Sequence, residues 1–137
     1  MREQFEVRLM EDNNPNRAYI EVYNGLLDSP LFDGFETLLL ICIMMESSAQ
    51  IDSINTATIS INKLCRYSKM SKKTVCRYIK KLEEKGVLIK QRNSTPDNGN
   101  TANTYKILNY ISVWDCKTME ELKRETDKIK SEVLING

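Results

Sequence analysis

The chain has 137 residues, of which 41% are hydrophobic and 28% are charged, as in an ordinary globular protein with a core of its own. It has no histidine, and none of its four cysteines forms a CxxC pair, which excludes a His-based catalytic triad and zinc-finger ligand spacing. The longest apolar run, residues 38–45, is far shorter than the ~20 residues of a membrane span, and no signal sequence opens the chain. We therefore expect a cytoplasmic protein that is not an enzyme and that needs no metal, cofactor or small-molecule ligand.

The net charge of +1 hides a very uneven distribution of charge along the chain. Residues 1–61 hold three basic and ten acidic residues, a net of −7, whereas residues 62–92 hold eleven basic and two acidic residues, a net of +9. A basic block of this kind usually faces a polyanion. The alternative is a solvated helix surface, which is common for lysine-rich helices.

The N-terminal part of the chain predicts strands. Residues 5–9 and 18–24 alternate apolar and polar side chains, and the turn formers of 11–17 would allow the two strands to form a hairpin. Residues 25–32 predict a short helical turn that breaks before Pro30.

The strongest helix signal covers residues 33–49. Asp33 and Glu36 have the spacing of a capping box, and apolar side chains occur nearly all round the helix axis. This helix should therefore lie in the centre of the core. The polar residues 52–58 predict a loop, and 58–61 predict a short strand.

Two helices separated by a tight turn follow. Residues 60–67 predict a short helix capped by Ser60, residues 68–71 a turn, and residues 72–85 a second helix that ends at Gly86. After it, residues 87–92 and 104–108 predict strands joined by a polar loop over 93–103, and residues 118–134 predict an amphipathic helix.

The helix over 72–85 separates charge from apolar side chains. At ~100° per residue, Val75, Ile79 and Leu82 fall on one arc with Tyr78, whereas Lys73, Arg77, Lys80 and Lys81 fall on the opposite arc. Ser71 is a suitable N-cap, and the helix dipole adds partial positive charge at the same end. The major groove of DNA admits one α-helix of this kind.

The stretch "LCRYSKMSKKTVCRYIKKLEEKGVLIKQR", followed by "NTYKI" after a polar loop, resembles the winged helix-turn-helix domain of bacterial, plasmid and phage DNA-binding proteins. The resemblance covers about residues 58–108 and implies a mainly α fold with a small antiparallel β-sheet. The upstream stretch "YIEVYNGLLDSPLFDGFETLLLICIMM" is more loosely similar to the leading segment of plasmid and phage replication initiators. Many relatives have glycine where this chain has Lys69, so lysine would be strained there if the turn needs a positive φ.

The candidate DNA-binding residues lie on the predicted recognition helix and on the first wing strand. The N-terminal residues of the helix would contact DNA, Lys80 and Lys81 would hold phosphates, and the wing strand would contact the DNA backbone. Lys85 could be either a partner of the helix dipole or a DNA ligand. The full set is Ser71, Lys72, Lys73, Thr74, Arg77, Lys80, Lys81, Lys90 and Arg92.

Two further features leave alternatives open. Cys76 lies on the flank of the basic face and is either a small filler residue or an oxidation-sensitive thiol. The heptad spacing within 118–134 fits either a homodimer interface or packing on the same domain. The seam consists of Met119, Leu122, Thr126, Ile129 and Val133.

These observations predict three parts of one protein. Residues 1–32 would pack on the domain as strands and a short helix, residues 33–111 would form the winged helix-turn-helix, and residues 112–137 would form the C-terminal helix. The predicted function is sequence-dependent binding of double-stranded DNA in plasmid or phage DNA maintenance, such as replication initiation, conjugative transfer or partition. The alternatives are a transcriptional regulator with the same binding mode and a winged-helix module that binds proteins.

Overall fold

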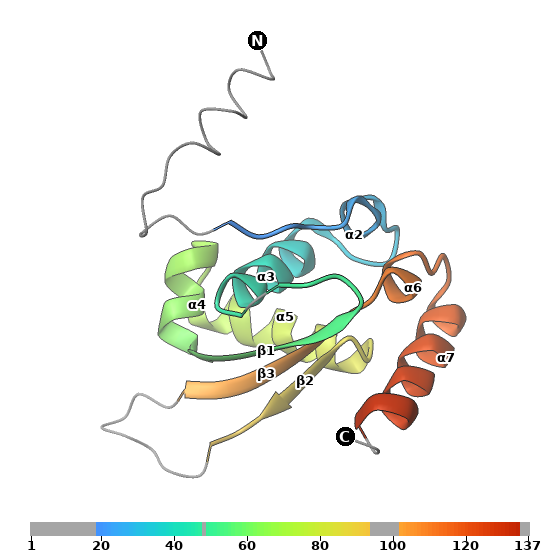
Figure 1. Cartoon of the computed structure of the whole chain (residues 1–137). Coiled ribbons are helices and arrows are strands. Elements are labelled where there is room, and N and C mark those ends of the chain that lie inside the picture. The colour runs from blue at the N-terminus through green and yellow to red at the C-terminus, as the bar shows by residue number, and fades with distance from the viewer. Residues whose placement is uncertain (1–18, 48, 94–101, 135–137) are drawn as a thin grey trace, which may run out of the picture.

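The computed structural model describes residues 19–47, 49–93 and 102–134 (Figure 1). The strand expected over 5–9, the turn over 11–17 and most of the wing loop lie outside the described residues. The helices are α2 (Asn24–Asp28), α3 (Gly34–Met45), α4 (Ile61–Ser68), α5 (Lys72–Glu84), α6 (Ile111–Trp114) and α7 (Met119–Ile129), which continues into the π-helical turn η1 (Lys130–Leu134). The strands are β1 (Ser53–Ser60), β2 (Leu88–Gln91) and β3 (Ala102–Asn109).

The strands form a small antiparallel sheet in the order β1-β3-β2. Figure 1 shows α3, α4 and α5 together on one side of this sheet, with α4 at one end of the molecule and α6 and α7 at the other. This arrangement confirms the expected fold class, a mainly α winged helix-turn-helix with a small antiparallel sheet.

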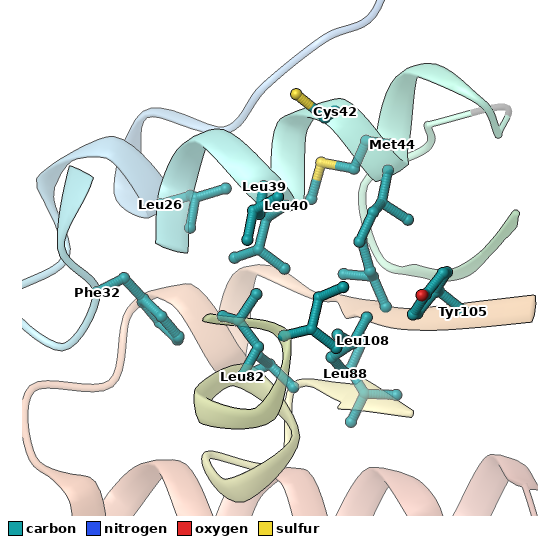
Figure 2. Close-up of a cluster of buried hydrophobic side chains, with 14 of the residues drawn as sticks. Leu26, Phe32, Leu39, Leu40, Cys42, Met44, Leu82, Leu88, Tyr105 and Leu108 are labelled. Atoms are coloured by element: carbon teal, nitrogen blue, oxygen red, sulfur yellow. The ribbon is translucent and has the colours of Figure 1, made fainter. Parts of the chain in front are cut away.

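Helix α3 is the central element of the core. Asp33 Oδ1 accepts a hydrogen bond from the Glu36 backbone N–H at 2.8 Å, and Glu36 Oε1 accepts one from the Asp33 N–H at 3.1 Å, which confirms the capping box. Figure 2 shows Leu39 and Leu40 of α3 directed into the same core as Leu82 of α5. Burial explains only part of its nearly continuous apolar sequence, because Phe35, Leu38 and Met45 of the same helix are 51%, 37% and 51% exposed.

Two sequence expectations are wrong in this region. Residues 19–23 form no strand, and α2 begins already at Asn24. Residues 52–58 are not a loop, because β1 starts at Ser53 and pairs along its whole length with β3. The alternation of buried Ala57 and Ile59 with exposed Thr56 and Thr58 follows the period of a strand.

The helix-turn-helix is formed by α4, the turn and α5. Ser60 Oγ caps α4 by accepting the Lys63 N–H at 3.1 Å. Lys69 in the turn has φ 59° and ψ 32°, the left-handed conformation, which is costly for a residue with a Cβ such as lysine. Gly86 after α5 has φ +86°, as expected for a residue that ends a helix.

The C-terminal segment packs on the rest of the chain. Trp114 is fully buried, its Nε1 donates a hydrogen bond to Asn109 Oδ1 at 2.9 Å, and its ring meets the Phe32 ring edge-on at 5.6 Å. The three central seam residues of the last helix, Leu122, Thr126 and Ile129, are buried, whereas Met119 and Val133 are 45% and 40% exposed. The seam is therefore largely used within the chain. Across the described ranges, no helix combines the length and apolar character that crossing a membrane would require.

Candidate nucleic-acid interface

The N-terminus of α5 is an exposed and well-capped helix end. Ser71 Oγ accepts the Thr74 backbone N–H at 3.2 Å and donates to Thr74 Oγ1 at 2.9 Å. Ser71, Lys72 and Lys73 are exposed, and no acidic residue lies in the first turn. The partial positive charge of the helix dipole therefore adds to two lysines at the same end.

The outward face of α5 is cationic, as the sequence predicted. Val75, Ile79 and Leu82 are buried, and the side of the helix opposite to them carries exposed Lys73, Arg77 and Lys80. This separation fixes the rotation of the helix, because burying the apolar arc leaves the cations pointing away from the core.

On the α3 side of this face, two cations lie over an aromatic ring. The Arg77 guanidinium carbon is 5.2 Å and the Lys81 Nζ 4.8 Å from the centre of the Tyr78 ring. Tyr78 itself packs against the ring of Phe35 at 5.3 Å, and Phe35 is 51% exposed. These contacts place Arg77 and Lys81 beside Tyr78 on the side of α5 that faces α3, while both residues stay exposed.

On the wing side, a groove of about 500 Å³ separates α5 from β2. The structure brings Lys80 together with Lys90 and Arg92 of the wing here. Glu83 and Glu84 line the same groove and offset part of the positive charge of these three cations. The outward face is thus bordered by Lys81 on the α3 side and by Lys90 and Arg92 on the wing side.

Lys85 does not belong to this surface. Its Nζ lies 2.6 Å from Glu36 Oε2 and 2.7 Å from Glu36 Oε1, and it donates to the Leu31 carbonyl oxygen at 2.6 Å. From the sequence, Lys85 was expected to be a partner of the helix dipole or a DNA ligand, and an ion pair with Glu36 was not expected. Glu36 stood out in the sequence only as a capping residue, and no local pattern relates it to Lys85.

The structure adds two cations that the sequence analysis did not single out as ligands. Arg66 in the last turn of α4 and Lys69 in the turn are exposed and precede the N-terminus of α5. In the sequence, the feature that could have indicated a role in DNA binding is their position shortly before Ser71, the cap of α5. In contrast, Asn103, which falls at the end of the polar loop predicted over 93–103, is buried in β3, where its Nδ2 donates to the Tyr105 hydroxyl at 3.4 Å.

The cysteines differ in accessibility. Cys76 is exposed in the wing-side groove, whereas burial raises the pKa of the Cys42 and Cys116 thiols. Among the residues that the structure describes, no group of three or more potential ligands is arranged to hold a metal ion.

A protein-family model described as a helix-turn-helix domain matches residues 36–88. The matched segment has the helix-turn-helix fold described above. The match runs from the first turn of α3 to the start of β2, and with β2 and β3 the domain has the winged arrangement of a DNA-binding module.

The chain also resembles a solved structure over most of its length, at low sequence identity. One similar solved structure is a possible transcriptional regulator from Methanosarcina mazei Go1, with 19% sequence identity and a TM-score of 0.41, covering 82% of this chain and 76% of the other. No curated protein matches the chain.

Proposed function

We propose that the protein binds double-stranded DNA in a sequence-dependent manner, with the N-terminal half of α5 in the major groove. The observation that carries this proposal is the position of the exposed cations. They lie on the second helix of a helix-turn-helix, on the face opposite to the buried Val75, Ile79 and Leu82. A merely solvated helix surface would not explain why the basic face coincides with the face that such domains present to DNA.

The residues of this surface divide into two roles. Lys72, Lys73, Thr74 and Arg77 lie within the first turns of α5, where side chains reach base edges. The planar guanidinium of Arg77 suits O6 and N7 of guanine. Ser71, Lys80 and Lys81 on α5, together with Lys90 and Arg92 on the wing, would hold phosphates on either side of the groove.

A titration with duplex DNA over a salt series tests the proposal. With roughly five or six phosphate contacts, log K should fall against log salt with a slope near −5. Binding that does not change between low and physiological salt would contradict it. Saturable binding to an acidic protein instead of DNA would favour the alternative module.

Two substitutions on the same face test the division of roles. Arg77→Ala should reduce the discrimination between a selected and a scrambled duplex by about 1–3 kcal/mol. Lys80→Ala should weaken binding to both duplexes alike and reduce the salt slope by about one. Equal losses on both duplexes for Arg77→Ala would show that Arg77 holds a phosphate.

We further propose that this binding serves the maintenance of plasmid or phage DNA. The support is the similarity of residues 19–45 to the leading segment of replication initiators. Transcriptional regulation is the second candidate, because the same domain serves both processes. Genome-wide mapping of binding sites separates them, since sites at a replication origin support maintenance and sites confined to promoters contradict it.

Residues 33–111 would form the DNA-binding unit, and residues 1–32 and 112–137 would pack on it. A homodimer through residues 118–134 is a prediction with reduced structural support, because only Met119 and Val133 of the seam are exposed. Sedimentation at roughly tens of micromolar, where weak dimers appear, tests it. A monomer at that concentration would mean that the seam acts only within the chain.

A further inference from the structure

One largely buried ion pair holds the C-terminal end of α5. The Lys85 ammonium has three oxygens around it, both carboxylate oxygens of Glu36 at 2.6 and 2.7 Å and the Leu31 carbonyl at 2.6 Å. It also lies 5.2 Å over the Phe32 ring. The side chain of Glu36 is 3% exposed and that of Lys85 is 22% exposed, so the pair is shielded from water on most sides.

Glu36 joins three parts of the fold through one carboxylate. Its Oε1 also accepts the Asp33 N–H at 3.1 Å and so closes the cap of α3. Through Lys85, the same carboxylate reaches the C-cap of α5 and the Leu31 carbonyl in the segment between α2 and α3. The start of the central helix and the end of the recognition helix therefore share one anchor.

The residue after Lys85 is held as well. Gly86 has φ +86°, and a Cβ at this position would lie 2.8 Å from Thr126 Oγ1, so α7 packs directly against the turn that ends α5. At the N-terminal end of α5, the Ser71 hydroxyl bonds to Thr74 and the Ser71 carbonyl accepts the Val75 N–H, so the cap is bonded within the helix, while Val75 is fully buried in the core. The direction in which α5 projects therefore depends on the core packing of Val75, Ile79 and Leu82 and on the anchors at its C-terminal end.

A buried ion pair is a weak source of net stability, because desolvation of the two charges offsets most of their attraction. It does fix geometry, since two hydrogen-bond acceptors, Glu36 Oε1 and the Leu31 carbonyl, and the second carboxylate oxygen at 2.6 Å surround one ammonium. Helix α5 is 13 residues long, or about 18–20 Å. A rotation of about 10° at its C-terminal end would move its N-terminal residues by about 3 Å, which is more than a hydrogen bond to a base edge tolerates.

We propose that Lys85 and Glu36 are positioning residues for DNA recognition. The pair sets the angle of α5 relative to α3 and thereby aligns Lys73 and Arg77 with the base edges. The effect on recognition rests on the proposed DNA binding, whereas the effect on the helix angle can be measured without DNA.

The test uses the double variant Lys85→Met/Glu36→Gln in the full chain. Glutamine keeps an oxygen for the Asp33 N–H, and methionine fills the volume of the lysine stem without leaving an unpaired charge. The matched control is Lys63→Met/Glu46→Gln, which removes the 2.9 Å ion pair between α4 and the other end of α3. The single variant Glu36→Gln serves if the double variant does not fold, since the cap is kept and Lys85 can turn to water.

Two measurements are made on each variant. The first is the set of amide residual dipolar couplings of α5 relative to β3 in the free protein. The second is the ratio of the dissociation constants for a duplex selected from a random library and for its scrambled form. We expect the couplings of α5 to change and the ratio to fall about tenfold, as for the loss of one base contact, while the control changes neither.

Unchanged couplings of α5, or an unchanged ratio, would overturn the inference. An equal loss on both duplexes with a salt slope smaller by about one would also overturn it, because Lys85 would then be a phosphate ligand. A wild-type protein that does not distinguish the two duplexes refutes the proposed function, and the couplings then still decide whether the pair sets the helix angle.

Discussion

Replacing Lys69 by glycine should stabilise the fold and weaken DNA binding in the same molecule. Lys69 lies in the turn between α4 and α5 with φ 59° and ψ 32°, and its side chain is exposed. The left-handed conformation costs a residue with a Cβ about 1–2 kcal/mol, and glycine does not pay this cost. The ammonium group next to the cap of α5, in contrast, would be lost as a phosphate contact.

The expected magnitudes are small but measurable. Glycine adds about 0.4–1 kcal/mol of conformational freedom to the unfolded chain, so the net gain in the free energy of unfolding should be about 0.5–1 kcal/mol. For a chain of 137 residues this raises Tm by about 2–4 °C in a calorimetric scan. The slope of log K against log salt for duplex DNA should become smaller by about one.

Lys69→Ala is the matched control for this experiment. It removes the same charge but keeps the Cβ, so it should weaken DNA binding as much as Lys69→Gly without raising Tm. If both variants unfold at the same temperature, the turn does not carry the backbone cost argued here. If neither variant changes the salt slope, Lys69 does not contact phosphate.

Three further predictions concern the cap, the C-terminal anchor and the thiols. Ser71→Ala should lower the free energy of unfolding by about 1 kcal/mol in a urea titration, whereas Ser71→Asp should retain it and still weaken DNA binding, because a carboxylate caps the helix but repels phosphate. Trp114→Phe should cost about 1–3 kcal/mol, because the buried Asn109 Oδ1 loses its donor; no change in the urea midpoint would contradict that role. Iodoacetamide at neutral pH should label Cys76 in the native protein and spare Cys42, whose pKa is raised by burial; equal labelling by mass spectrometry would contradict this.

Local signals in the sequence were sufficient for the helix-turn-helix. The cap at Ser71, the glycine at 86 and the apolar period of α5 all lie within 16 residues, and each acts on its immediate neighbours. A positive φ at Lys69 was indicated only through the resemblance, because many relatives have glycine at this position. These features needed no knowledge of the rest of the chain.

The features that the sequence did not reveal depend on partners far away in the chain. The sequence predicts a strand only at the end of β1, over 58–61, because residues 52–58 are rich in small polar side chains, and pairing with β3 is what makes them a strand. Lys85 and Glu36 are 49 residues apart, so nothing in the pattern around either one indicates the ion pair. The contacts of Arg77 and Lys81 with Tyr78 likewise depend on side-chain conformations that helical spacing alone does not fix.

The most direct test of the central claim is a map of amide chemical-shift changes on adding a duplex selected from a random library. If the outward face of α5 enters the major groove, the largest changes should fall on residues 71–81, with smaller ones at Lys90 and Arg92 on the wing and little change in α7. Changes confined to α7 or to the exposed face of α3, or no changes at all, would contradict the account.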